Sequence, residues 1–224
     1  MPPRWHPSPN FGPRRDGLRP SLVVLHFTAM RDALSALNRL CDPEAEVSAH
    51  YLIGNDGTVW HLVQEEMRAW HAGAGEWAGQ GDINSRSIGI ELDNTGTHPF
   101  SELQMAALEP LLEGILSRHG IRPEGVIGHS DMAPGRKTDP GPRFDWARLG
   151  RLGLAAAPIQ SSIVPDVSPA AFRDLARSAG FTAPVDDALL LANVRLRLRP
   201  WARGPLTAED LAAVAGMPAA GDLA

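Results

Sequence analysis

The chain of 224 residues contains one cysteine, one lysine and no long apolar run. The single cysteine, Cys41, excludes an internal disulfide, and its place in a helical pattern predicts a packed thiol. No stretch approaches the length of a membrane span, so we predict none. The net charge of −5 does not indicate a positively charged surface for nucleic-acid binding, and we predict no nucleic-acid partner.

Signals for export and for several common chemistries are also missing. The N-terminus has neither an apolar core of signal-peptide length nor a lipidation cysteine, so the sequence as given predicts a cytoplasmic protein, or a periplasmic one if it is truncated. No Gly-x-Ser-x-Gly elbow, phosphate-binding loop or Cys-x-x-Cys pair is present. A hydrophobic content of 43% with mixed charges is typical of a globular protein, which we expect to be monomeric.

Four apolar segments predict strands. Residues 1–20, rich in proline and arginine, predict an extended arm. Residues 21–27 form a continuous apolar run, typical of a central strand buried on both faces. Residues 50–63 predict a hairpin that turns at Asp56-Gly57. Residues 87–92 and the pair Val126-Ile127 predict two more strands.

Two helices are predicted between these strands. Residues 31–41 place Leu34, Leu37 and Leu40 three apart on one expected apolar face, and Pro43 ends the pattern. A second helix begins at Ser101, which has capping-box spacing, and Gly120 ends it. Its predicted apolar stripe consists of Leu103, Ala107, Leu111 and Ile115. Pro110 predicts a kink or a shortened first half.

The remaining segments predict a functional loop and a small helical appendage. Residues 64–85 lack a clear period and hold Trp70 and His71, as a functional loop would. We predict a first domain over residues 1–150, a linker over 151–166 and a small domain over 167–224. Helical patterns cover about 168–179, 186–197 and 207–216, and this bundle is expected to dock on the first domain.

Residues 128–141 concentrate His129, Asp131, Lys137 and Asp139 in a segment whose prolines and glycines predict irregular structure. The segment follows a buried strand, a position that suits a metal site. Lys137 is the only lysine among 21 basic residues, which suggests a requirement for a compact ammonium. A solvated loop with chance charges is the alternative from this segment alone.

Together these residues can form a zinc hydrolase site. Such sites use three protein ligands, often histidine and carboxylate, and the candidates are His26, His129 and Asp139. Glu91 is a candidate general base and Lys137 a candidate cation for a developing oxyanion. Taken singly, His26 could be a core residue at a strand end, and Glu91 could face solvent on an edge strand.

Five motifs occur in a familiar order. They are Val-Val-Leu-His26-Phe-Thr-Ala, Ser-Ala-His50-Tyr-Leu-Ile, Trp-His71-Ala-Gly, Asn84 to Ser-Ile-Gly-Ile-Glu91-Leu, and Gly-His129-Ser-Asp with Lys137-Thr-Asp139-Pro-Gly. In this order they resemble the type 2 N-acetylmuramoyl-L-alanine amidases over about residues 20–150. The resemblance implies an α/β fold, in some schemes α+β, with a mixed central sheet flanked by helices and a small C-terminal three-helix domain.

The resemblance also assigns expected roles. His26, His129 and Asp139 match the family's zinc ligands, Glu91 the proposed base, and Lys137 the lysine that stabilises the transition state. His71 matches a histidine near the substrate groove, and Asn84 and Trp70 are expected to bind substrate with it. Some relatives carry a tyrosine where this chain has Ala49, which makes a tyrosine-assisted mechanism doubtful here.

The implied reaction is cleavage of the amide between N-acetylmuramic (or anhydromuramic) acid and L-alanine of the stem peptide. The expected partners are peptidoglycan or its fragments. The alternative is a recognition module that binds muropeptides without cleaving them. The C-terminal segment, with Phe172 to Phe181 and Ala192 to Trp201, more weakly resembles a peptidoglycan-binding helical domain, and a packing domain without ligand is an equal alternative.

Overall fold

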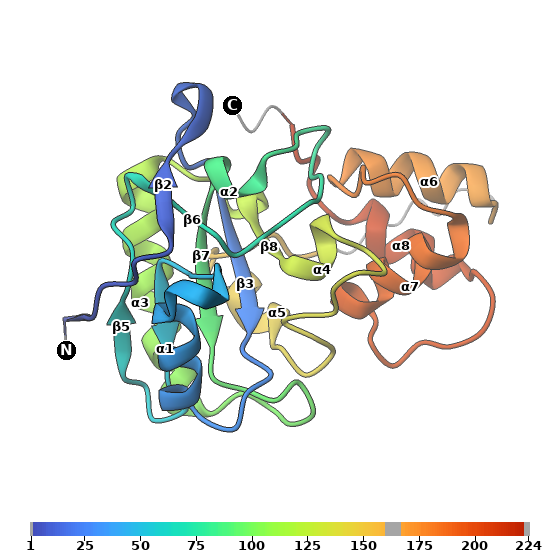
Figure 1. Ribbon diagram of the computed structural model, residues 1–224. Coiled ribbons are helices and arrows are strands. Elements are labelled where there is room, and N and C mark those ends of the chain that lie inside the picture. Colours follow the sequence, from blue (N-terminus) through green and yellow to red (C-terminus); the bar gives the residue numbers. More distant parts are fainter. Residues whose placement is uncertain (1, 160–166, 222–224) are drawn as a thin grey trace.

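A central six-stranded sheet organises the chain, whose computed structural model describes residues 2–159 and 167–221 (Figure 1). The strand order is β1-β5-β4-β7-β3-β8. In that order the bounds are Arg4–Trp5, Val59–His61, Tyr51–Ile53, Ser87–Leu92, Leu22–Phe27 and Val126–Gly128. β3 is parallel to both β7 and β8, and β4 is parallel to β7. The hairpin strand β5 is antiparallel to β4, so the predicted mixed sheet is confirmed.

The N-terminal segment and the predicted functional loop contribute strands that the sequence did not reveal. β1 pairs with β5, and β2 (Phe11–Pro13) pairs with β6 (Met67–Ala69) in a separate two-stranded sheet. The region predicted as a loop also ends in the short helix α2 (Ile83–Arg86). Each of these elements is two to four residues long, too short for periodicity to show.

One face of the sheet is covered by α3 (Glu102–His119) and α5 (Trp146–Arg151). The hydroxyl of Ser101 accepts a hydrogen bond from the Gln104 N–H at 3.1 Å, which confirms the predicted helix start. The predicted apolar stripe is confirmed in part: Ile115 is buried and Ala107 and Leu111 pack against the core, but Leu103 is 62% exposed. The buried apolar side chains are those of Met105, Leu108, Leu112 and Ile115. The helix also continues through Pro110, so the predicted shortened first half is wrong.

The opposite face is partly covered by α1 (Ala33–Cys41), which buries Ala36, Leu37 and Leu40. The expected burial of Leu34 is wrong, since this side chain is 64% exposed. Positions three apart rotate by about 60° per step around a helix, so Leu34 lies about 120° away from Leu40. The side of α1 that packs on the sheet therefore buries Leu40 and leaves the Leu34 side chain exposed.

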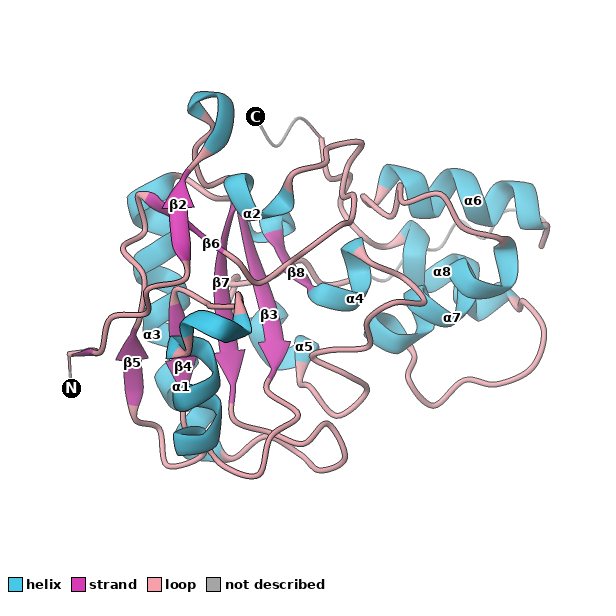
Figure 2. Cartoon of the chain, in the orientation of Figure 1, coloured by secondary structure: helices cyan, strands magenta, loops and turns pink. Residues whose placement is uncertain are grey.

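The C-terminal helices lie beside the sheet, beyond its β8 edge (Figures 1 and 2). They are α6 (Pro169–Ser178), α7 (Asp187–Leu198) and α8 (Ala208–Ala215), as predicted. Phe172 and Val194 share one hydrophobic core with Leu22 and Ile127 of the sheet. The bundle therefore docks on the first domain through a common core. Residues 160–166 of the predicted linker lie outside the described residues, and the predicted domain limits stay a prediction.

Three short 3-10 helices also occur among the described residues: Arg15–Gly17, Pro43–Ala45 and Pro123–Gly125. Within residues 2–159 and 167–221, no helix is both long and apolar enough to cross a bilayer.

Candidate metal centre and active site

The register of the parallel strands brings the predicted site residues to one edge of the sheet. His26 of β3 lies directly opposite Glu91 of β7. On the other side of β3, Leu25 lies opposite Gly128, the last residue of β8, so His129 follows at the same edge. Carboxyl ends of parallel strands are where α/β sheets hold ligands. The edge-strand alternative for Glu91 is wrong, because β7 lies between β4 and β3.

The segment after β8 begins with a short helix, α4 (His129–Met132), where the sequence predicted irregular structure. A carboxylate oxygen of Asp131 accepts a hydrogen bond from the Gly128 N–H at 2.8 Å and stabilises the start of this turn. The Ser130 N–H donates to the carbonyl oxygen of Asp139 at 2.9 Å. This bond folds the following loop back onto α4, so that Asp139 lies beside His129.

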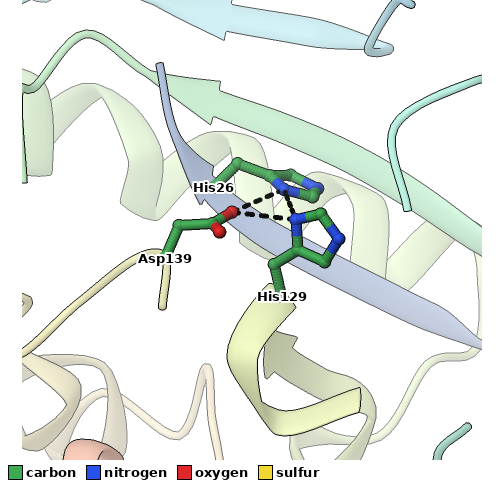
Figure 3. Close-up of side chains that lie close together, drawn as sticks. All are labelled: His26, His129 and Asp139. Carbon is green, nitrogen blue, oxygen red and sulfur yellow. Dashed lines mark hydrogen bonds and ion pairs between the residues drawn. The ribbon is translucent and has the colours of Figure 1, made fainter. Parts of the chain in front are cut away.

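His26, His129 and Asp139 converge at one point (Figure 3). The Nδ1 atoms of the two histidines are 2.9 Å apart. The Asp139 Oδ2 lies 2.9 Å from the first and 3.0 Å from the second. All three side chains are buried. Among the described residues this is the one group of three or more such side chains with metal-ligand geometry.

The hydrogen bonds of His129 fix its tautomer. Its Nε2 lies 2.8 Å from the carbonyl oxygen of Ala72, which can only accept, so Nε2 carries the proton and Nδ1 has a free lone pair. The Asn84 side-chain oxygen in turn accepts the N–H groups of His71 and Ala72 at 3.1 and 2.8 Å. Asn84 therefore orients the carbonyl that orients His129.

A second chain of hydrogen bonds fixes the tautomer of His26. The Ser87 hydroxyl donates to the Ile83 carbonyl at 2.6 Å, so its oxygen accepts from the His71 Nε2 at 3.1 Å. The His71 Nδ1 then accepts from the His26 Nε2 at 3.0 Å, which leaves a lone pair on the His26 Nδ1. A Cβ on Gly89 would lie 2.4 Å from the His71 ring, so the ring needs glycine at this strand position.

Two lone pairs and a carboxylate oxygen thus face one another within about hydrogen-bond distance, an arrangement that requires a cation. Burial first, and then His129, lowers the pKa of His26 to about 4, so His26 is neutral, as a metal ligand must be. The donor set fits a metal ion.

Glu91 and Lys137 line a cavity of about 350 Å³ together with the three candidate ligands. The Glu91 Oε2 is buried and has no hydrogen-bond partner among the described residues. Burial first, and then the Asp139 charge, raises the pKa of Glu91 to about 8, against a smaller opposing effect of Lys137. Lys137 is exposed. The cavity therefore combines a metal-ligand cluster, a carboxylate of high proton affinity and an accessible ammonium.

The predicted substrate-binding residues lie in two places. Trp70 and His71 line the cavity. Asn84 is buried behind it and contacts the backbone of residues 71–72. Their roles toward a substrate stay predictions. The sequence analysis missed the contributions of Ser87 and of the Ala72 carbonyl, because neither a serine in a strand nor a backbone group carries a motif of its own.

A family model described as N-acetylmuramoyl-L-alanine amidase matches residues 16–142. The chain is 41% identical over 156 residues to the N-acetylmuramoyl-L-alanine amidase AmiD of Escherichia coli, a match that covers 62% of this chain and 55% of that protein. It is 37% identical over 162 residues to the E. coli 1,6-anhydro-N-acetylmuramyl-L-alanine amidase AmpD, covering 64% of this chain and 87% of AmpD.

Solved structures of N-acetylmuramoyl-L-alanine amidases and related proteins are also similar to this chain. AmiD of E. coli in complex with an anhydro-N-acetylmuramic acid peptide matches with a TM-score of 0.78 and 31% identity, covering 90% of each chain. AmpDh3 of Pseudomonas aeruginosa matches with a TM-score of 0.80 and 32% identity, covering 91% of this chain and 92% of that one. Residues 1–166 are a smaller share of the chain than the 90% and 91% that these two matches cover. The structural likeness therefore extends into the C-terminal helices.

The family match covers more than half of the chain, and it includes His26, His129 and Asp139. The resemblance read from the five motifs is confirmed. The chain belongs to the N-acetylmuramoyl-L-alanine amidase family.

Proposed function

We propose that the chain is a zinc-dependent N-acetylmuramoyl-L-alanine amidase. It would hydrolyse the amide between the lactyl group of N-acetylmuramic or anhydromuramic acid and L-alanine of the stem peptide. The observation that carries the proposal is the convergence of two imidazole lone pairs and one carboxylate oxygen beside an unpartnered Glu91 carboxylate. Metal-assisted hydrolysis uses such a ligand set together with a nearby base.

His26, His129 and Asp139 would hold the zinc ion. Two neutral nitrogens and one carboxylate oxygen are a usual ligand set for a catalytic zinc site, which keeps further positions open. When bound, the ion supplies Lewis acidity, which makes water more acidic and polarises a carbonyl. The hydrogen bonds from His26 to His71 and from His129 to the Ala72 carbonyl hold both rings in the orientation that binding requires.

Glu91 is placed to take the proton of the attacking water and to pass it to the leaving amine. In the metal-free protein burial raises the pKa of Glu91, so its carboxylate has a high affinity for the proton that it would take. Lys137 lies on the same cavity and can hold positive charge near the oxyanion that develops on the scissile carbonyl. The Glu91 Oε2 has no hydrogen-bond partner among the described residues, and Lys137 is exposed at the cavity.

The substrate class follows from the relatives. AmpD proteins are named for 1,6-anhydro-N-acetylmuramyl-L-alanine, and the solved AmiD and AmpDh3 structures hold anhydromuramic peptides. We therefore propose soluble muropeptides, with or without the anhydro ring, as substrates of this chain. Action on intact peptidoglycan is a further prediction. The cytoplasmic location expected from the sequence also stays a prediction.

The test is muropeptide hydrolysis, followed by release of the free stem peptide. The wild-type protein should cleave an anhydro-muropeptide, and Asp139→Ala or a chelator should reduce turnover by about 10³-fold or more, because the Lewis acid is lost. Addition of Zn²⁺ should restore the chelated wild type but not the variant. Activity that is indifferent to both treatments would refute the proposal, and tight binding of an uncleaved muropeptide would favour a recognition module instead.

A further inference from the structure

The buried ion pair between Arg197 and Asp131 connects the C-terminal helices to the metal-ligand cluster. Asp131 belongs to α4, two residues after the candidate ligand His129, and Arg197 belongs to α7. Their side chains are 1% and 2% exposed, and a guanidinium nitrogen of Arg197 donates to Asp131 Oδ2. Among the described residues, no other cation pairs with Asp131.

The same guanidinium contacts the other elements that surround the start of α4. It stacks over the ring of Trp146, with 3.9 Å between its central carbon and the ring centroid. It also lies 3.3 Å from the Val126 carbonyl of β8 and 3.4 Å from the Ala156 carbonyl. Arg197 thus joins the strand before His129, the helix that starts with His129, and α5.

These contacts reach both ends of the ligand-bearing loop. The Asp131 oxygen that accepts from Arg197 also accepts from the Gly128 N–H, the residue just before His129. Gly128 packs so tightly that a Cβ there would lie 2.7 Å from Pro140 and 3.3 Å from Trp146. The Asp139 carbonyl accepts from the Ser130 N–H of α4. A shift of the first turn of α4 would therefore displace His129 and Asp139 together.

Stability alone is a poor account of this pair. A buried ion pair recovers its desolvation cost only when its remaining polar atoms are satisfied. The Arg197 Nε is buried without a hydrogen-bond partner among the described residues. An apolar side chain of similar volume would fill this space at less cost, but it could not fix the orientation of the Asp131 carboxylate.

We infer that Arg197 is a positioning residue for the amidase reaction: through Asp131 it holds the first turn of α4, and with it the ligands His129 and Asp139, in the geometry that binds metal. The inference rests on the proposed function. If Arg197 has this role, the C-terminal helices are part of the catalytic unit. Loss of Arg197 should then reduce activity equally on small soluble substrates and on large ones.

Arg195 offers a matched control on the same helix. It is also buried, at 8% exposure, and it pairs with Asp210 of α8 through two hydrogen bonds of 2.9 and 2.6 Å. Its other partners are the carbonyls of Gly204 and Pro205, so all its hydrogen bonds stay within the C-terminal segment. We therefore expect loss of Arg195 to disturb the bundle without removing a hydrogen bond to α4.

The experiment compares full-length Arg197→Met, Arg197→Lys and Arg195→Met proteins with the wild type. We expect Arg197→Met to weaken Zn²⁺ affinity, measured by competition with a chromophoric chelator, by about 10- to 100-fold, as is usual when an outer partner of a ligand is lost. On a soluble anhydro-muropeptide, kcat should fall by about tenfold while KM changes little. Arg197→Lys should recover part of both losses, because an ammonium can still pair with Asp131.

A readout without metal separates this inference from the amidase proposal. In the metal-free protein, amide hydrogen exchange over residues 129–132 should accelerate in Arg197→Met and stay unchanged in Arg195→Met. If the wild type proved inactive on muropeptides, the exchange and Zn²⁺ measurements would still decide the role of Arg197.

The double variant Asp131→Asn, Arg197→Met removes both charges and leaves no unpaired buried ion. It therefore tests the role of the ion pair if Arg197→Met alone does not fold. Zn²⁺ affinity and kcat equal to those of the wild type in the folded variants would overturn the inference. Equal losses in Arg195→Met would overturn it as well, because general loosening of the bundle would then explain them.

Discussion

The buried carboxylate of Glu65 and the partly buried carboxylate of Glu91 lie in opposite electrostatic environments. Glu65 accepts hydrogen bonds from Tyr51 at 2.8 Å, from Arg118 at 2.6 and 3.1 Å, and from His119 at 2.8 Å. Burial alone would raise its pKa, but the bonds from Arg118, His119 and Tyr51 lower the pKa to about 2. Glu91 has an oxygen without a partner among the described residues, and burial, followed by the Asp139 charge, raises its pKa to about 8.

The difference shows how one chain uses the same side chain for architecture and for chemistry. The donors around Glu65 come from β4 and from the C-terminal end of α3, so this carboxylate ties α3 to the sheet. Glu91 lines the cavity with the candidate metal ligands, and its Oε2, which lacks a partner among the described residues, keeps the ability to accept and release a proton. An unsatisfied buried group is costly, and such groups concentrate at functional sites.

The largest expected contrast concerns turnover. Glu91→Gln should lower kcat on an anhydro-muropeptide by about 10²-fold or more, because it removes the general base. Zn²⁺ binding should persist in this variant. Glu65→Gln, which makes the same chemical change far from the ligands, should leave kcat within about twofold of the wild type. Equal losses in the two variants, measured by steady-state kinetics, would refute the assignment of Glu91.

A second contrast, of intermediate size, concerns stability. Glu65→Gln should reduce the free energy of unfolding by about 2 kcal/mol, since Tyr51, His119 and Arg118 lose a charged acceptor. We expect less than the full cost of breaking a buried pair, because the Arg118 side chain is 52% exposed and solvent screens it. Urea unfolding of the metal-free proteins measures the change. A loss in Glu91→Gln as large as that in Glu65→Gln would contradict the comparison.

The third contrast concerns how the free energy of unfolding changes with pH. The contributions of Glu65 and Glu91 to this change should have opposite signs. Glu65 has a lowered pKa when folded, so its stabilisation is present above pH 4.5 and disappears as the pH falls toward 2. Glu91 has a raised pKa, so the metal-free protein loses stability as the pH rises from 4.5 to 8. Each slope is at most about 1.4 kcal/mol per pH unit.

Unfolding of the metal-free proteins across this pH range tests the signs. Glu91→Gln should become more stable relative to the wild type as the pH rises, whereas the penalty of Glu65→Gln should fade in acid. A stability difference between Glu91→Gln and the wild type that stays constant from pH 4.5 to 8 would show that Glu91 has an ordinary pKa in the folded protein.

The sequence predicted the long elements well, because their signals are local. The hairpin turn at Asp56-Gly57, the start of α3 at Ser101 and the three C-terminal helices depend on turn chemistry, capping and periodicity within a few residues. It failed where burial depends on what a helix packs against. Leu34 and Leu103 fit apolar patterns, yet the sheet contacts neighbouring positions and leaves both exposed.

By itself the sequence determined which groups the site contains: two histidines, an aspartate, a glutamate and a lysine, in motifs that identify the family. Only the tertiary structure decided how these groups act. The parallel register placed His26 beside Glu91, and the desolvation of Glu91 set its proton affinity. The partner of Asp131 also emerged only there, since Arg197 lies 66 residues away and tertiary packing alone brings the two charges together.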